Sequence, residues 1–189
     1  MDGALIVSGT EKGAEYFYEI LKQNNYNQIF SVGTSEEAQK YFSEHDFDLC
    51  IINAPLADEF GDRLAKNIIS YSSVQVILVV KEDLFDVVSA KMDSVGVFTV
   101  TKPVSRQVLM NTLRLAGTVS NKLKMLNDQN KKLQQKIEDI RLVDRAKCIL
   151  IEYLKMSEVE AHKYIEKQAM NLRETKRSIA ESILKTYEG

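Results

Sequence analysis

The 189-residue sequence contains no tryptophan, two prolines, two cysteines and two histidines. No apolar run approaches the roughly 20 residues that a membrane-spanning helix needs, so we expect no membrane segment. The N-terminal residues lack the basic and long apolar stretches of a signal peptide, which favours a cytoplasmic protein. Cys50 and Cys148 each lie among apolar residues, and we expect both to be reduced core residues.

Several kinds of chemical site are also missing from the sequence. The cysteines are not paired at a zinc-binding spacing, and we interpret His45 and His162 as surface residues rather than metal ligands. No nucleophile–base pair and no glycine-rich phosphate loop is visible. We therefore predict no catalytic residue, no metal and no cofactor, and an enzyme is the weakest of the functional interpretations.

The charges are unevenly divided along the chain. Residues 1–105 contain 16 acidic and 8 basic side chains, whereas residues 106–189 contain 11 acidic and 17 basic ones. The formal net charge of −2 hides this division. An acidic module followed by a basic module indicates that the second half has a polyanionic partner.

The first half alternates between two hydrophobic periods. Strands are predicted at residues 4–7, 28–32, 48–52, 74–80 and 96–100, and amphipathic stretches of about ten residues lie between them. Strands that alternate with helices favour βαβ units, a parallel sheet and an α/β fold of three layers. Ser35 is a plausible N-cap for the second helix, and a fifth helix should begin near Ser105.

A heptad pattern follows from residue 105 to about residue 144. Leu109, Ala116, Leu123, Asn130 and Ile137 occupy a positions, and Val119, Leu126, Leu133 and Ile140 occupy d positions. This pattern predicts a coiled-coil dimer, in which a buried asparagine at an a position favours one register and two parallel strands. The alternative is a helix that packs only on its own domain. The predicted dimer seam consists of Leu123, Leu126, Asn130, Leu133, Ile137 and Ile140.

Residues 141–189 read as three short helices. Ser157 and Glu160 form an S-x-x-E capping box at the start of the second, and Thr175 is a candidate cap for the third. Helices this short bury little surface alone, so we expect them to pack on each other and on the preceding coiled coil.

The first half resembles a response-regulator receiver domain, which implies a flavodoxin-like fold with a five-stranded parallel sheet. In that family the first strand ends in acidic residues that hold magnesium, the third in the aspartate that accepts the phosphoryl group, and the fourth in serine or threonine. Here Ser8 and Gly9 stand at the end of the first strand, Asn53 at the end of the third and Val80 at the end of the fourth. Each of these residues departs from the family pattern. Only Lys102-Pro103 matches, and the resemblance implies a cis peptide bond there.

These departures predict a pseudo-receiver. Asn53 has no carboxylate that could attack phosphorus, and Ser8 and Gly9 supply no carboxylate for Mg²⁺. Val80 lacks the hydroxyl that would sense a phosphoryl group. We expect Asn53 to cap a loop and to hydrogen-bond Lys102 or a backbone amide. The alternative is that the pocket of Ser8, Gly9, Val80 and Lys102 binds some other ligand.

The C-terminal part resembles the ANTAR domain, the RNA-binding module of bacterial antiterminators. The resemblance is carried by Ala146-Lys147 before an apolar pair, by Ser157, Glu158, Ala161 and Tyr164, by Ala169-Met170 and by Ile179-Ala180. Cys148 and Ile151 depart mildly from the pattern. The resemblance implies binding to hairpin loops in a nascent leader transcript, where a stabilised hairpin prevents an overlapping terminator from forming.

Six basic residues are the candidate RNA-binding side chains, because RNA recognition pairs basic groups with phosphates and polar or aromatic groups with splayed bases. They are Arg145, Lys147, Lys163, Arg173, Lys176 and Arg177. Arg173, Lys176 and Arg177 could form one patch near a helix N-terminus, which itself favours phosphate. Tyr164 could stack on a base, although a core position is the more ordinary role for it.

The sequence thus predicts a pseudo-receiver over residues 1–118, a coiled-coil helix over 119–140 and a three-helix ANTAR bundle over 141–189. The predicted function is that of a dimeric antiterminator that binds RNA hairpins and is controlled without aspartate phosphorylation, for instance by a regulatory sensor protein. The rival interpretations are a protein-binding adaptor with a helical docking tail and a DNA-binding response regulator. No helix-turn-helix pattern supports the latter.

Overall fold

The computed structural model describes residues 3–188 of the chain. Its contacts divide the chain into two compact units between Leu123 and Lys124. Helix α5, Arg106–Leu154, begins in the first unit and ends in the second. None of the helices within residues 3–188 combines the length and the apolar character that crossing a bilayer requires.

The first unit is built on a parallel sheet of five strands. The strands are Gly3–Ser8 (β1), Gln28–Val32 (β2), Leu49–Asn53 (β3), Gln75–Lys81 (β4) and Phe98–Lys102 (β5), in the spatial order β2-β1-β3-β4-β5. All four neighbouring pairs are parallel. The predicted five-stranded α/β fold is therefore confirmed, and each observed strand lies within two residues of its predicted range.

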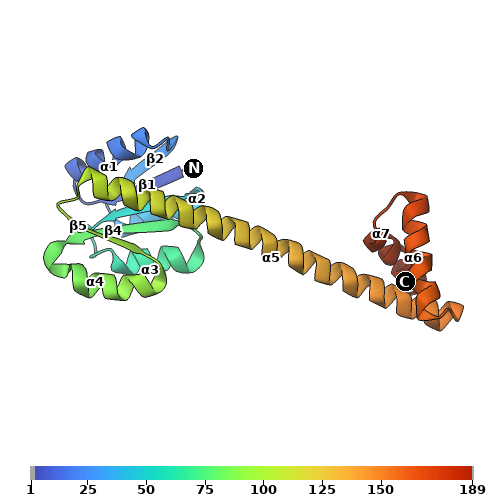
Figure 1. Cartoon of the computed structure of the whole chain (residues 1–189). Coiled ribbons are helices and arrows are strands. Elements are labelled where there is room, and N and C mark those ends of the chain that lie inside the picture. The colour runs from blue at the N-terminus through green and yellow to red at the C-terminus, as the bar shows by residue number, and fades with distance from the viewer. Residues whose placement is uncertain (1–2, 189) are drawn as a thin grey trace. The chain divides into compact units, whose positions relative to one another are not determined.

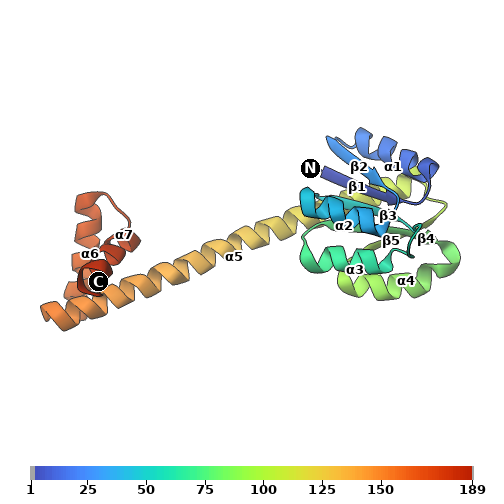
Figure 2. The same cartoon turned by 180° about the vertical axis from the view of Figure 1, so that it is seen from behind.

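Helices cover both faces of this sheet (Figures 1 and 2). The helices are Glu11–Gln23 (α1), Ser35–Glu44 (α2), Asp62–Tyr71 (α3) and Phe85–Met92 (α4), with 3₁₀ turns at Glu82–Leu84 and Asp93–Val95. Because side chains alternate along a strand, Leu5 and Val7 of β1 pack toward α2, α3 and α4, whereas Ala4 and Ile6 pack toward α1 and the start of α5.

The N-terminus of α2 differs from its prediction by one residue. Thr34, not Ser35, is the N-cap, and its side chain accepts a hydrogen bond from the backbone N–H of Glu37 over 3.1 Å. Ser35 is the first helical residue, and its N–H donates instead to the carboxylate of Asp58. The helix thus has two capping groups, and the second comes from a distant loop that no local pattern could reveal.

The beginning of α5 belongs to the core of the first unit. Leu109 and Leu113 pack with Phe17 of α1, and Leu109 and Ala116 are buried. Leu109 and Ala116 occupy the first two a positions of the heptad pattern, but both are already buried in the first unit. The side chains that could form a seam therefore begin beyond Ala116.

The second unit packs the end of α5 against Glu158–Leu172 (α6) and Lys176–Glu188 (α7). Ala146 and Leu150 of α5, Ala161 and Ile165 of α6 and Ala180 of α7 form the centre of its core. The predicted capping box of Ser157 and Glu160 is present, and Thr175 caps α7 by accepting from the N–H of Ser178. The first of the three predicted helices is not a separate helix but the end of α5.

The two cysteines differ in environment. Cys50 is buried in β3, and burial raises the pKa of its thiol. Cys148 is exposed, so the expectation that it is a core residue was wrong. Its neighbours Ala146, Ile149 and Leu150 form the inward face of α5, and the helical period turns Cys148 away from that face.

Candidate functional site

One candidate site lies where three strands of the sheet end. We call it the strand-end pocket; it has a volume of about 390 Å³ and is lined by Thr10, Lys12, Gly13, Tyr16, Phe17, Asn53, Lys102, Pro103 and Val104. Ser8 ends β1 beside Asn53, which ends β3. Open parallel sheets bind ligands at this edge, so the residues there decide what the domain can do.

Asn53 and Lys102 are held by separate hydrogen bonds. The side-chain amide of Asn53 donates to the Ser8 hydroxyl over 2.9 Å, and that hydroxyl donates to the backbone carbonyl of Thr10. The Lys102 ammonium donates to the backbone carbonyl of Ala54 over 2.5 Å. The expectation that Asn53 bonds Lys102 or a backbone amide was wrong, because Ser8 lies beside it on the neighbouring strand. The peptide bond Lys102-Pro103 is cis, as the resemblance implied.

Helix α1 packs tightly against the side chains of Asn53 and Ser8. A β-carbon added at Gly13 would overlap the side-chain amide of Asn53, and it would lie 2.8 Å from the hydroxyl oxygens of Ser8 and Thr10. Only a glycine lets the helix backbone come this close without moving a side chain. Gly13 is therefore matched to the asparagine and the serine that stand at the ends of the two strands.

The strand-end pocket does not suit a magnesium ion. Mg²⁺ is usually bound through one or two carboxylates, and none of the described residues that line the pocket carries one. The nearby acidic side chains are used elsewhere: Asp58 accepts from the N–H groups of Ser35 and Glu36, and Glu59 accepts from the N–H of Leu64. The Ser35 N–H holds the pKa of Asp58 below its usual value.

The end of β4 carries an apolar residue and a lysine. Val80, at the position expected to carry a sensing hydroxyl, is fully buried in β4. Lys81 follows it and pairs in register with Lys102 of β5. Burial, together with the charge of Lys81, lowers the pKa of Lys102. The strand ends thus present ammonium, amide and hydroxyl groups in place of carboxylates.

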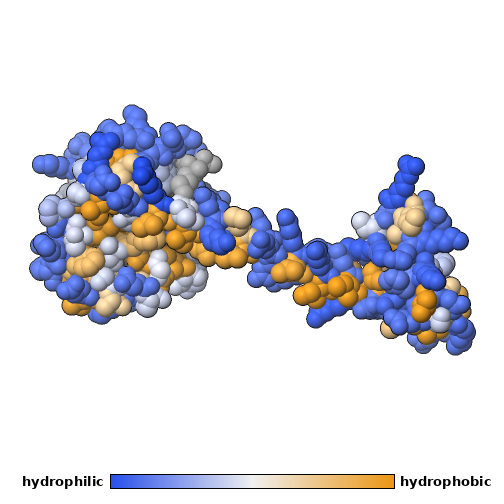
Figure 3. All heavy atoms as spheres, viewed as in Figure 1, coloured by the Kyte–Doolittle hydropathy of each residue, from blue (hydrophilic) through white to orange (hydrophobic). Residues whose placement is uncertain are grey.

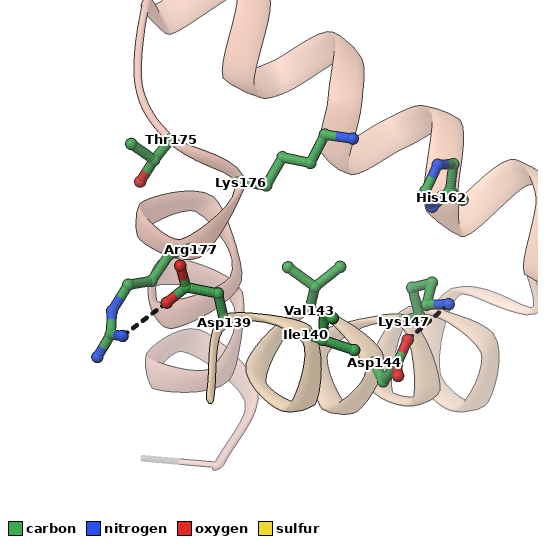
Figure 4. Close-up of a pocket in the computed structure, with 9 residues that line it drawn as sticks. All are labelled: Asp139, Ile140, Val143, Asp144, Lys147, His162, Thr175, Lys176 and Arg177. Atoms are coloured by element: carbon green, nitrogen blue, oxygen red, sulfur yellow. Dashed lines mark hydrogen bonds and ion pairs between the residues drawn. The ribbon is translucent and has the colours of Figure 1, made fainter. Parts of the chain in front are cut away.

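A second candidate site lies in the helical unit. The helical groove, as we call it, has a volume of about 440 Å³ and runs between α5, α6 and α7 (Figure 4). Ile140 and Val143 of α5 are its apolar residues. The remaining lining residues are polar or charged: Asp139, Asp144, Lys147, His162, Thr175, Lys176 and Arg177.

The groove brings together three of the six predicted RNA-binding residues. Lys147 comes from α5, and Lys176 and Arg177 come from the first turn of α7. Arg173 is the C-cap of α6, with a positive φ of 56°, and is not among the lining residues. Arg145 and Lys163 also lie outside the lining. Tyr164 is 37% exposed and so is not a fully buried core residue.

Sequence reasoning missed two features of the groove. His162 was interpreted only as a surface residue; its side chain is 49% exposed, but it lies in the groove and contacts Glu166 at 3.2 Å. The acidic residues were also missed. Arg177 pairs with Asp139, Lys147 with Asp144, and Lys176 with Glu166, at 2.7, 2.7 and 2.5 Å respectively. The pairs of Lys176 and Arg177 join residues of different helices, so no local pattern could indicate them.

Comparisons with known families assign both units. Residues 4–114 match the response regulator receiver domain, and residues 131–184 match the ANTAR domain. The chain is an ANTAR-type response regulator. The receiver match covers the sheet and the strand-end pocket, and the ANTAR match covers all the residues of the helical groove.

Two curated relatives are named as regulatory proteins. The chain is 27% identical over 168 residues to the transcriptional regulatory protein PdtaR of Mycobacterium tuberculosis, covering 89% of this chain and 82% of PdtaR. It is 28% identical over 85 residues to the aliphatic amidase regulator of Pseudomonas aeruginosa, covering 45% and 43% of the two chains.

Solved structures share the receiver fold. The receiver domain of an HD domain-containing protein from Pseudomonas fluorescens is 20% identical and aligns with a TM-score of 0.59, over 66% of this chain and 92% of that one. A receiver domain from Clostridium thermocellum is 18% identical with a TM-score of 0.57, over 67% and 99%. At these identities the likeness concerns the fold alone.

Helix α5 exposes a row of apolar residues along its length (Figure 3). The side chains at the a and d positions of the heptads from Leu123 to Ile140 are exposed: Leu123 45%, Leu126 47%, Leu133 59%, Ile137 51% and Ile140 60%. Asn130 is exposed among them. Such a row is typical of a helix that pairs with another helix. Ile140 also lines the helical groove, so the row of exposed apolar residues ends at this groove.

Proposed function

We propose that this protein is an RNA-binding transcription antiterminator. Its ANTAR domain stabilises hairpins in nascent leader transcripts, so that an overlapping terminator cannot form. The observation that carries the proposal is the helical groove, where Lys147, Lys176 and Arg177 converge within the region that matches the ANTAR family. Basic side chains beside apolar surface suit a loop that offers both phosphates and unstacked bases.

We propose further that two copies act together. The exposed a and d positions of α5 would form a parallel coiled coil, with Asn130 setting the register. A dimer that holds two ANTAR domains converts the second hairpin contact into an intramolecular one and so raises the overall affinity. Each phosphate contact that is neutralised adds a salt-dependence slope of about −0.7 on single strands.

We propose that RNA binding is controlled without phosphorylation of an aspartate. The strand-end pocket has an amide where an acceptor would stand and no carboxylate for a metal. A partner protein, such as a sensor, would then regulate the protein by covering the dimer seam or the RNA-binding face. This part of the proposal rests on the chemistry of the pocket, and its direct test is a phosphorylation assay.

Binding of the full-length protein to labelled leader-region RNA hairpins, with duplex DNA of equal length as competitor, tests the proposal. We expect hairpin binding that weakens as salt rises and that duplex DNA competes for poorly. A folded dimer that binds no hairpin above the duplex background would favour the protein-binding adaptor instead. Preferential binding of the duplex would favour a DNA-binding regulator.

A further inference from the structure

The charges of the helical groove are not those of a simple phosphate-binding surface. Asp144 and Glu158 pair with Lys147, at 2.7 and 3.3 Å, and Asp139 and Glu181 pair with Arg177, at 2.7 and 2.8 Å. Glu166 pairs with Lys176. Three basic side chains therefore face five carboxylates, of which Asp139 and Asp144 line the groove itself.

A bare phosphate backbone gains little from such a surface. Sequence-independent affinity for nucleic acids comes from basic side chains that replace counterions on phosphates. Here each basic side chain of the groove already has a carboxylate partner, and a phosphate that approached would be repelled by that partner. The hydrogen bonds of Gln135 and Arg177 hold the pKa of Asp139 below its usual value, so this carboxylate is charged at neutral pH.

A nucleobase meets the same groove differently. Its edge carries N–H donors as well as acceptors, whereas a phosphate carries only acceptors. The carboxylates of Asp139 and Asp144 can accept from amino or imino groups, and Lys147 and Arg177 can donate to carbonyl and ring-nitrogen atoms. The apolar face of a base can pack on Val143, which lines the groove and is not part of the proposed dimer seam (Figure 4).

We propose that the helical groove is a site for one unstacked base of the RNA loop, and that Asp139 and Asp144 are its specificity-determining residues. They repel phosphate and accept hydrogen bonds from the base, so a loop binds where a regular duplex does not. This inference rests on the proposed RNA-binding function and assigns its selectivity to these two carboxylates.

The test compares wild type with Asp139→Asn/Asp144→Asn. The matched control is Glu138→Gln/Glu152→Gln, which neutralises two other carboxylates on α5. Neither Glu138 nor Glu152 lines the groove. Each protein is titrated, at one fixed salt concentration, with a labelled leader-region hairpin and with a duplex RNA of equal length that has no loop. Circular dichroism confirms that the helix content of each variant equals that of wild type.

We expect the groove variant to bind the duplex about three- to tenfold more tightly than wild type does, because repulsion of phosphate is relieved. Its affinity for the hairpin should stay unchanged or fall, so the ratio of hairpin to duplex affinity drops. The control should raise both affinities by the same small factor. If the groove variant also raises both affinities equally, the two carboxylates provide only general charge and the inference is overturned.

A second arm locates the base. Each loop nucleotide of the hairpin is made abasic in turn, and the affinity loss is measured for wild type and for the groove variant. At one loop position the abasic change should cost the groove variant less than it costs wild type, because contacting partners give non-additive effects. Equal losses at every position would overturn the base site even where hairpin binding is selective. A wild-type protein that does not distinguish hairpin from duplex would instead overturn the proposed function itself.

Discussion

The side-chain amide of Asn53 donates a hydrogen bond of 2.9 Å to the hydroxyl of Ser8, which joins the ends of β3 and β1. An amide at the end of β3 and a hydroxyl at the end of β1 leave these two strand ends without a nucleophilic carboxylate. The receiver fold is therefore retained while its strand ends carry different chemistry.

Treatment with acetyl phosphate and magnesium should leave the intact mass of the protein unchanged, because Asn53 supplies no carboxylate that could attack phosphorus. The variant Asn53→Asp should also fail to form a stable adduct, since Ser8 and Gly9 still provide no carboxylate for the metal. Intact-mass spectrometry measures both. A wild-type adduct of one phosphate would show that another acceptor exists and would contradict control without phosphorylation.

The packing of Gly13 against Asn53 predicts a conditional effect of Gly13→Ala. In wild type the added methyl group overlaps the Asn53 amide, and the free energy of unfolding should fall by about 1–2 kcal/mol. In an Asn53→Ala background the shortest overlap is gone, while the contacts of 2.8 Å with the hydroxyls of Ser8 and Thr10 remain. There Gly13→Ala should cost clearly less than in wild type, because helix propensity offsets part of the remaining strain. Urea titrations of the four proteins measure the coupling, and equal effects in both backgrounds would contradict the packing argument.

The capping box of α6 predicts a pH dependence. The Ser157 N–H donates to the Glu160 carboxylate over 2.8 Å, and this bond lowers the pKa of Glu160 from its ordinary 4.5. A lowered pKa in the folded state stabilises the fold above the unfolded pKa, and this contribution is lost as pH falls through the folded pKa. The thermal midpoint of wild type should therefore exceed that of Glu160→Gln at pH 7, and the difference should shrink progressively below about pH 4.5. A difference that persists unchanged at pH 2 would exclude ionised Glu160 as the cause.

The exposed a and d positions of α5 predict a dimer that charged substitutions in the seam can dissociate. Leu126→Glu/Leu133→Glu places like charges at two d positions and should convert the dimer to a monomer in sedimentation experiments. The variant Lys131→Glu/Lys132→Glu changes charge at adjacent positions outside the seam and should remain dimeric. The monomer should bind RNA with two hairpins more weakly, and RNA with one hairpin about equally. A wild-type monomer with full affinity for paired hairpins would contradict the dimer mechanism.

The sequence predicted the sheet well for a definite reason. Each strand is a short apolar run bounded by polar or turn residues, as at Gln28–Val32, where prediction and structure coincide. The predicted boundary between coiled coil and ANTAR helices was harder to place. No proline or glycine interrupts residues 118–154, and α5 continues through the whole stretch.

The parts of the sites that escaped prediction depend on tertiary contacts. The heptad pattern includes Leu109 and Ala116 because their spacing suits a seam, but both are already buried in the first unit. Asp139 and Arg177 are 38 residues apart, and their ion pair exists only once α7 packs beside α5. The basic residues of the groove could be predicted from family resemblance, whereas their acidic partners could not.

The central claim, that the ANTAR domain binds RNA through the helical groove, is tested most directly by salt titrations of hairpin binding. Wild type is compared with Lys176→Ala/Arg177→Ala and with the control Lys131→Ala/Lys132→Ala, which removes two lysines of α5 that do not line the groove. We predict that Lys176→Ala/Arg177→Ala loses most of the affinity, because both side chains line the groove that takes the loop. Its salt slope should stay close to that of wild type, since both side chains are already paired with carboxylates and do not bind phosphates. The control should keep the affinity and the slope of wild type. Equal losses in the two variants would contradict the claim, because binding would then depend on overall charge and not on the groove.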